Sequence, residues 1–160
     1  MQRLRTALIA ASVLAVMLPA EAAVAKKNPY TAKGLCGPSF SVIDRKQLYD
    51  VSPLDGRRYH LSTAVLMYSS QTGENCAVHL KRRRIDKPDS VDITLITRPP
   101  SDANSDGDGG LNLKFFAGPV KVPARGKCVQ WWGSTTQKQF KFNTSVDLYS
   151  GFRSRWVHCD

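Results

Sequence analysis

Short runs of alternating apolar and polar residues, separated by turn residues, constrain the fold of this chain more than any other feature. Asn75–Arg83 (NCAVHLKRR) and Ser90–Thr97 (SVDITLIT) show the two-residue period of a half-buried strand. After residue 25, we find no convincing 3.6-residue period of a helix. The sequence therefore predicts an all-β, single-domain antiparallel β-sandwich or barrel. Further strands are expected at Ser39–Leu48, Tyr59–Tyr68, Leu111–Ala117, Lys127–Ser134, Gln139–Asp147 and Arg155–Cys159.

The two clearest runs are expected to pair with each other as a β-hairpin. Placing Leu80 opposite Ile93 on one face also places Lys81 opposite Asp92 on the other face. Because opposite charges then face each other, this register has support beyond the hydrophobic pattern.

The first residues are organised like a secretory signal peptide. Two arginines precede an apolar run, Ala7–Leu18, that is too short to span a bilayer. Cleavage is expected after Ala22 or Ala25, and a buried N-terminal helix is the structural alternative. No second hydrophobic segment follows. We therefore expect a removed signal peptide (1–25), a flexible N-terminal arm (26–35) and an all-β domain (36–160) in a secreted, monomeric protein with no transmembrane segment.

Four cysteines follow the predicted signal peptide: Cys36, Cys76, Cys128 and Cys159. An even number in an exported chain indicates two disulfides, with three connectivities open. We favour Cys36–Cys76 with Cys128–Cys159, because each bond would join neighbouring strands and close a loop of moderate length. The cysteines lack the close C-x-x-C pairs that are typical of zinc sites.

The chain is basic, with a formal net charge of +10, which favours polyanionic surroundings such as anionic wall polymers, membrane surfaces or nucleic acid. Its densest basic run is Lys81-Arg82-Arg83-Arg84 (KRRR). In a strand, Lys81 and Arg83 would share the outer face and are candidate ligand-binding residues. A solvated strand face that discourages aggregation is the structural interpretation. Aromatic residues are not interleaved with the run, so we expect no nucleic-acid binding.

The pair Trp131-Trp132 gives a second candidate binding surface. In a strand, one ring should face the core and the other should face outward, where an exposed indole can stack on a sugar. The structural alternatives are that loops bury both rings or that the outer ring packs on an arginine.

The stretch DANSDGDGG, residues 102–110, begins like a calcium-binding loop. Oxygen-bearing side chains recur at every second position, from Asp102 and Asn104 to Asp106 and Asp108. The bidentate glutamate of the calcium template is missing, and no helices flank the stretch. We interpret it as a long, mobile connection between strands, with weak calcium binding as the alternative and no other cofactor expected.

The residues that could support catalysis form no recognisable motif. Only three histidines occur, none in a metal-binding pattern, and the cysteines are expected in disulfides. His79 could be combined on paper with Asp92 or Asp44 and a serine, but the spacing does not support a triad. We therefore predict a non-enzymatic protein. A small hydrolase, or a protease inhibitor that uses a loop at Gly126–Cys128, is the second alternative.

Several short motifs together resemble the spore-associated protein A family of small secreted actinobacterial proteins. They are Leu35–Gly37 (LCG), Thr72–Val78 (TGENCAV), Phe115–Val120 (FFAGPV), Gly126–Trp131 (GKCVQW) and Trp156–Cys159 (WVHC). The resemblance implies export and association with the spore surface, and it implies no catalytic residues or cofactor. Our prediction is a secreted, non-enzymatic protein of the cell or spore surface. The first alternative is a binding module for anionic or glycan cell-wall polymers.

Overall fold

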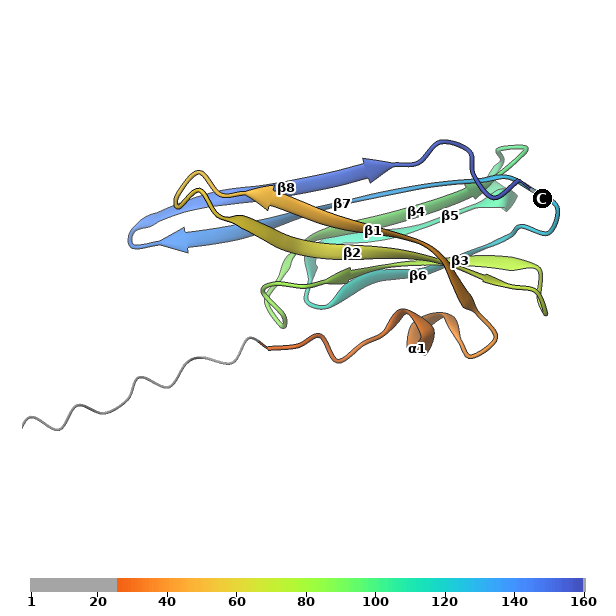
Figure 1. Cartoon of the computed structure of the whole chain (residues 1–160), viewed down its shortest axis with the longest axis horizontal. Helices are drawn as coiled ribbons and strands as arrows, with labels where there is room; N and C mark the ends of the chain where they lie inside the picture. The colour runs from red at the N-terminus through yellow and green to blue at the C-terminus, as the bar shows by residue number, and fades with distance from the viewer. Residues whose placement is uncertain (1–25, 160) are drawn as a thin grey trace, which may run out of the picture.

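The computed structural model describes residues 26–159, so the predicted signal peptide lies outside the described residues. Between these limits, no helix is long and apolar enough to cross a membrane. The elements follow one another as shown in Figure 1: α1 (Ala32–Cys36), β1 (Ser41–Val51), β2 (Arg58–Ser69), β3 (Glu74–Lys81), β4 (Asp89–Thr97), the 3₁₀ turn η1 (Asp102–Asn104), β5 (Ser105–Leu113), β6 (Phe116–Pro123), β7 (Val129–Lys141) and β8 (Thr144–Arg153).

Two antiparallel four-stranded sheets stack on each other, with strand orders β1-β2-β3-β6 and β5-β4-β7-β8 (Figure 1). This arrangement confirms the predicted all-β class and gives a sandwich, with no closed barrel among the described strands. The predicted pairing of Asn75–Arg83 with Ser90–Thr97 is wrong. β3 pairs with β2 and β6, whereas β4 pairs with β5 and β7. An alternating pattern shows which residues share a face, but it does not identify the strand that lies alongside.

The main core lies between the two sheets and is built mostly from small and β-branched side chains around Trp131. Its buried members are Ala64, Leu66, Ala77, Val91, Ile93, Leu95, Ala117, Val120, Val122, Ala124, Val129 and Trp131. β4 supplies Val91, Ile93 and Leu95, as its alternation predicted. β3 differs, because all its residues from Asn75 onward are buried.

β3 is buried on both faces because the N-terminal segment covers the outer face of its sheet. Residues of this segment pack with the apolar row of β3 in a second cluster: Ala32, Cys36, Phe40, Val65, Met67, Cys76, Val78 and Leu80. The other row of β3, which includes Ala77, His79 and Lys81, points between the sheets. The expected outer position of Lys81 is therefore wrong, because the apolar row occupies the outer face beneath α1.

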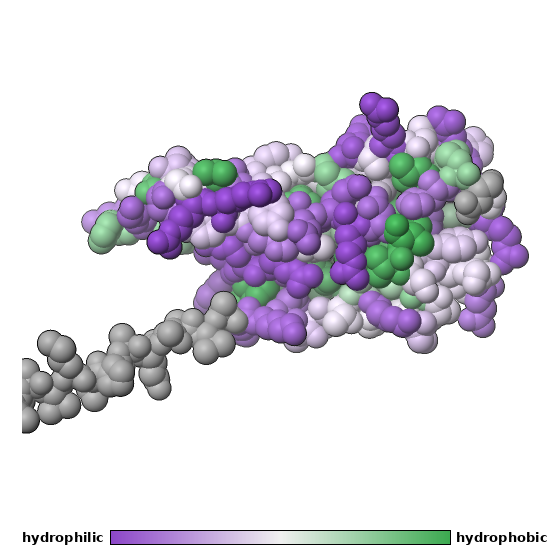
Figure 2. All heavy atoms as spheres, viewed as in Figure 1, coloured by the Kyte–Doolittle hydropathy of each residue, from purple (hydrophilic) through white to green (hydrophobic). Residues whose placement is uncertain are grey.

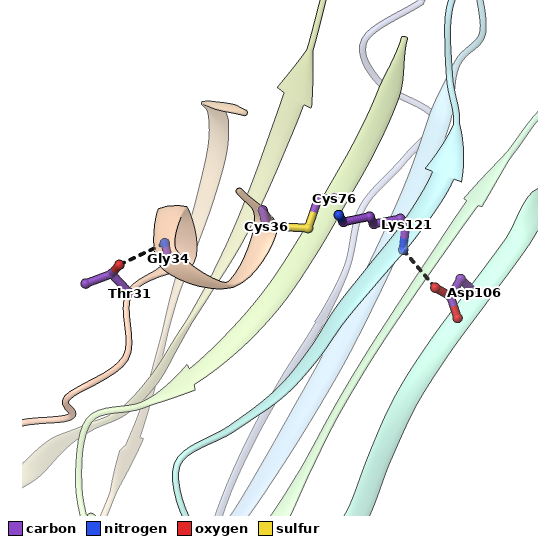
Figure 3. Close-up of a disulfide and its surroundings, with 6 residues drawn as sticks. All are labelled: Thr31, Gly34, Cys36, Cys76, Asp106 and Lys121. Carbon is purple, nitrogen blue, oxygen red and sulfur yellow. Dashed lines mark hydrogen bonds between the residues drawn. A yellow bond between two sulfur atoms is a disulfide. The ribbon is translucent and has the colours of Figure 1, made fainter. Parts of the chain in front are cut away.

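The segment 26–35, expected to be a flexible arm, is docked on the domain. Asn28 Nδ2 donates hydrogen bonds to the backbone oxygens of Lys81 (3.1 Å) and Phe115 (2.8 Å). The Thr31 hydroxyl accepts from Gly34 N–H and caps α1, as Figure 3 shows.

Both predicted disulfides are confirmed. Cys36–Cys76 joins the end of α1 to β3 (Figure 3), and Cys128–Cys159 joins the start of β7 to the C-terminal segment. Beside the second bond, Val129 and Val157 exchange backbone hydrogen bonds of 2.9 and 2.8 Å. This isolated bridge replaces the strand that we expected at Arg155–Cys159.

Aspartate side chains join the edges of the two sheets. Lys121 N–H of β6 donates to Asp106 of β5 (2.8 Å, Figure 3), and Gly118 N–H donates to Asp108 (2.6 Å). At the opposite edge, Tyr149 N–H of β8 donates to Asp50 of β1 (2.8 Å). These bonds give partners to edge N–H groups that would otherwise be open to strand addition.

Two of the predicted strands extend across turns. The expected strand Leu111–Ala117 spans the connection between β5 and β6, and Gln139–Asp147 spans the β7–β8 turn. Both errors arise where a turn carries apolar residues. Phe142 lies in the β7–β8 turn itself, because Lys141 pairs with Thr144.

Candidate functional site

A cleft of about 650 Å³ opens where the β1–β2 turn, the β3–β4 connection and the end of β7 meet. Five cations line what we call the basic cleft: Arg57, Arg83, Arg84, Lys138 and Lys141. The other lining residues are Asp55, Tyr59, Gln139 and Phe140. The β1–β2 turn and the β7–β8 tip lie at the same end of the molecule (Figure 1), and the visible face there is mostly hydrophilic (Figure 2).

A buried ion pair fixes the connection that carries the cleft arginines. Lys81 Nζ lies 2.5 Å from Asp89 Oδ2, and the exposed fractions of the two side chains are 0% and 1%. Lys81 Nζ also donates to the backbone oxygens of Lys87 (2.6 Å) and Leu113 (3.3 Å). Burial lowers the pKa of Lys81, and the hydrogen bond and charge of Asp89 oppose this shift. The pair joins the two ends of the β3–β4 connection, so Lys81 has a structural position and is not a surface ligand-binding residue.

The single carboxylate of the basic cleft is already occupied by its neighbours. Tyr59 donates from its hydroxyl to Asp55 Oδ2 at 2.5 Å, and Gln139 Nε2 donates to the same oxygen at 3.2 Å. The backbone N–H of Arg57 donates to Asp55 Oδ1 at 3.1 Å. The Tyr59 hydrogen bond, above all, lowers the pKa of Asp55, and the same bond raises the pKa of Tyr59. Asp55 therefore orients Tyr59 and Gln139.

The two arginines of the β3–β4 connection are held against aromatic rings. The Arg83 guanidinium carbon lies 3.7 Å from the centre of the Tyr59 ring. Arg84 donates from Nε to Asp89 Oδ1 (2.8 Å), and its guanidinium carbon lies 5.6 Å from the centre of the Phe140 ring. The N–H groups of a guanidinium lie in its plane, so an aromatic ring packed on its face leaves them free to bind an anion in a bidentate manner. Burial lowers the pKa of Arg83, but a guanidinium stays protonated in proteins.

The remaining cations of the basic cleft differ in their hydrogen-bond and ion-pair partners. Lys141 Nζ donates to the backbone oxygen of Leu54 at 3.0 Å. Lys138 lies opposite Asp147 in the β7–β8 register. No ion pair joins Arg57, Arg83 or Lys138 to a carboxylate within the part of the chain that the structure describes. The cleft therefore carries positive charge that its own side chains do not neutralise.

Gln139 adds an unpaired acceptor to the basic cleft. Its side chain is only 8% exposed, and its Oε1 has no hydrogen-bond partner among residues 26–159. A buried carbonyl oxygen without a partner is costly, and a ligand hydroxyl would remove that cost. Beside it, the Phe140 ring is 62% exposed and presents an apolar face. Cations, an acceptor and an aromatic face together suit a ligand that bears both anionic groups and hydroxyls.

A serine and a histidine do come together, but away from the cleft. Ser62 Oγ lies 2.7 Å from His79 Nε2, and both side chains are fully buried between the sheets. His79 Nδ1 lies 2.7 Å from the backbone oxygen of Asp92, so Nδ1 carries the hydrogen and Nε2 accepts from the serine. The Asp92 carboxylate instead accepts hydrogen bonds from Ser134. Because substrate cannot reach this pair and no carboxylate orients the ring, the arrangement stabilises the fold.

One tryptophan of the pair faces the core and the other faces outward against an arginine, which is one of the structural alternatives given by the sequence. Trp131 is fully buried and packs edge-on against Phe152, so it is a core residue and not a ligand-binding one. Trp132 is partly exposed, and the Arg153 guanidinium carbon lies 4.8 Å from the centre of its ring. Neither residue lines the basic cleft, whereas Arg83 does.

The prediction that residues 102–110 form a mobile loop is wrong. Asp102 and Asn104 belong to the η1 turn, whereas Asp106 and Asp108 lie in strand β5. The last two carboxylates accept backbone N–H groups of β6, as described above. No group of three or more metal-ligating side chains occurs within the described range.

A second cleft of about 500 Å³ lies between the N-terminal segment and the outer face of the β1–β2–β3 sheet. Its cations are Lys27, Lys33, Arg45 and Arg82, and no carboxylate lines it. The Lys27, Lys33 and Arg45 side chains are exposed, and no hydrogen bond to a described residue holds them in place. The basic cleft is better organised because stacking and the buried ion pair hold its arginines.

Comparison with known proteins gives one informative relative. The chain is similar to Spore-associated protein A of Streptomyces coelicolor (strain ATCC BAA-471 / A3(2) / M145). The two are 28% identical over 120 residues, which cover 75% of this chain and 69% of that protein. No family model and no solved structure matches the chain. This similarity supports the relationship suggested by the sequence motifs, and the name connects that relative with spores.

Sequence reasoning found one cation of the basic cleft, Arg83, and missed the others. The cleft residues come from three chain segments, 55–59, 83–84 and 138–141, which only the fold brings together. The KRRR run was a usable signal, but it was assigned to a strand face. In fact β3 ends at Lys81, and the arginines lie in the following connection.

Proposed function

We propose that the protein is a secreted, non-enzymatic binding protein that holds an anionic polymer of the cell wall or spore surface in the basic cleft. The observation that carries the proposal is the position of Arg83. Its guanidinium is stacked on Tyr59, and the nearby Asp55 carboxylate is occupied by hydrogen bonds from Tyr59, Gln139 and the backbone. Within the described residues, Arg83 is thus positioned without an ion pair, and the five cations of the cleft outnumber its one carboxylate.

The rest of the cleft supports a polymer that also carries hydroxyl groups. The Gln139 oxygen lacks a donor, and the exposed Phe140 ring can cover the apolar face of a sugar or polyol. Export is supported by the predicted signal peptide and by two disulfides, which form in oxidising compartments. Similarity to a protein named for spore association supports a location at the cell or spore surface.

Binding is favoured over the catalytic alternative. The basic cleft contains no serine, cysteine or histidine that could act as a nucleophile with its base. The inhibitory alternative stays a prediction: the Gly126–Cys128 segment lies in a tight turn closed by a 3.1 Å hydrogen bond from Lys127 N–H to the Ala124 backbone oxygen, beside the Cys128–Cys159 disulfide.

Retention of the signal-free protein on isolated cell walls tests this proposal. The double variant Arg57→Gln/Arg83→Gln should bind at least about tenfold more weakly, because each arginine can supply a charge-assisted hydrogen bond. A matched control, Lys33→Gln/Arg45→Gln, removes the same charge from the second cleft and should bind like the unaltered protein. High salt should release the unaltered protein, since a charge contact is screened within about 3 Å at 1 M ionic strength.

Two results would contradict the proposal. Equal weakening of both double variants would mean that net charge alone retains the protein on the wall. Retention that high salt leaves unchanged would remove the electrostatic mechanism.

A further inference from the structure

The tip of the β7–β8 hairpin exposes two phenylalanines that nothing in the described chain covers. Phe142 is 95% exposed and Phe140 is 62% exposed. Lys141 pairs with Thr144, so Phe142 and Asn143 form the two-residue turn at the very end of the hairpin. Figure 1 shows this tip reaching beyond the neighbouring β1–β2 turn along the long axis of the molecule.

Phe142 is also a poor residue for the backbone conformation of the turn. Its φ angle is +54°, a region that bulky residues rarely adopt and that Gly or Asn adopts readily. Two-residue hairpin turns normally use Gly, Asn or Asp at such positions. A large apolar side chain therefore stands at a site where folding alone would favour a small or polar one, and residues of this kind cluster at functional sites.

Positive charge surrounds the exposed rings. Lys141 lies in the chain between the two phenylalanines, and Lys138 precedes them on the same strand. The Arg84 guanidinium carbon lies 5.6 Å from the centre of the Phe140 ring. Two carboxylates lie in this region: Asp147 opposite Lys138, and Asp55, which lines the basic cleft with Phe140.

We propose that this hairpin tip docks on an anionic lipid bilayer by inserting Phe142 among the headgroups. Phe142 does not line the basic cleft, although Phe140 and Lys141 beside it do. At the end of the hairpin, Phe142 can enter a bilayer, which receives an apolar side chain without a groove. Aromatic side chains are favourable at the membrane interface, and neighbouring lysines and arginines are attracted to anionic lipids. The inference goes beyond the wall-polymer proposal and does not depend on it.

Co-sedimentation of the signal-free protein with lipid vesicles tests the inference. The protein should bind vesicles that contain phosphatidylglycerol and should not bind vesicles of phosphatidylcholine alone. Phe142→Asn should weaken binding about tenfold, the scale expected for losing the burial of one large apolar side chain. Because Asn tolerates a positive φ, this variant should melt at the same temperature as the unaltered protein or higher. The control Val42→Asn removes a 40% exposed apolar residue from β1 and should leave vesicle binding unchanged.

The results separate the two proposals. Absence of binding to anionic vesicles, or equal binding by Phe142→Asn and the unaltered protein, would overturn the lipid inference. If Phe142→Asn lost only its retention on cell walls, the tip would be part of the polymer site, and the lipid inference would again be wrong. If Arg57→Gln/Arg83→Gln kept vesicle binding while losing wall retention, both proposals would be supported as separate activities.

Discussion

Two charged stretches of the molecule, Lys81–Lys87 and Asp102–Asp108, differ in how the fold uses their side chains. In the acidic stretch, Asp106 and Asp108 accept backbone N–H groups of the facing sheet edge. In the basic stretch, Lys81 forms a buried ion pair with Asp89. Arg83 is stacked on the Tyr59 ring and has no carboxylate partner among the described residues. A charged side chain is free for a ligand only where the surrounding backbone and side chains do not satisfy it.

The largest effect is expected from breaking the ion pair beneath the basic stretch. Asp89→Ala should lower the free energy of unfolding by about 3–5 kcal/mol, because it leaves Lys81 buried without its partner. Chemical denaturation measures this change. The control Asp86→Asn removes the charge of a carboxylate of the same connection that is 45% exposed and pairs with Lys26, so its effect should be small. Asn also tolerates the backbone φ of +71° at this position. Equal effects of the two variants would contradict the structural position assigned to Lys81.

A smaller effect is expected in the acidic stretch. Asp108→Ala should lower the free energy of unfolding by about 1–2 kcal/mol, since Gly118 N–H loses its acceptor at the edge of the sandwich. Denaturation again gives the value, and Asp102→Ala is the matched control because the Asp102 side chain makes no hydrogen bond within the described residues. If Asp102→Ala destabilised the protein as much as Asp108→Ala, the bond across the sheet edge would not explain the position.

The class of the fold and its disulfides could be predicted from the sequence, because alternation and cysteine spacing are local signals. The orientation of β3 could not be predicted, since both of its faces are buried. An apolar row is normally expected to face the space between the sheets, but here it faces outward beneath α1. β5 was missed because its composition is that of a turn. In β5, Gly109 is required by close strand packing and not by a turn, because a Cβ at this position would lie 2.7 Å from the Asp92 Cβ on the neighbouring strand. The basic cleft required the arrangement of three distant segments.

His79 of β3, which is buried between the sheets two residues before Lys81, should make stability depend on pH. Burial lowers the pKa of His79 below its ordinary value of 6.5 and outweighs the opposing influence of Asp92. The unfolded chain therefore binds the proton more readily, and stability should fall as the pH drops below about 6.5. His60 shows a shift of the same direction and is less buried. The slope of unfolding free energy against pH should flatten in His79→Gln more than in His60→Gln, and the reverse order would contradict the buried neutral His79.

The smallest expected effect is that of calcium on the acidic stretch. Millimolar calcium should leave the melting temperature unchanged, because the Asp106 and Asp108 carboxylates already serve as acceptors for β6. A ligand that binds the folded state must raise the melting temperature. A calcium-dependent increase that disappears in Asp106→Asn would show that these side chains remain available to a cation, and the contrast between the two stretches would fail.

The central claim is that Arg57 and Arg83 of the basic cleft remain free for an anionic ligand. It is tested most directly by mapping where an anionic polyol binds. In an NMR titration with a short glycerol phosphate oligomer, backbone amide signals of residues 55–59, 83–84 and 138–141 should shift first and together, since these segments line the basic cleft. Shifts centred instead on Lys27, Lys33, Arg45 and Arg82, which line the second cleft, would contradict the account, as would shifts spread evenly over all exposed cations.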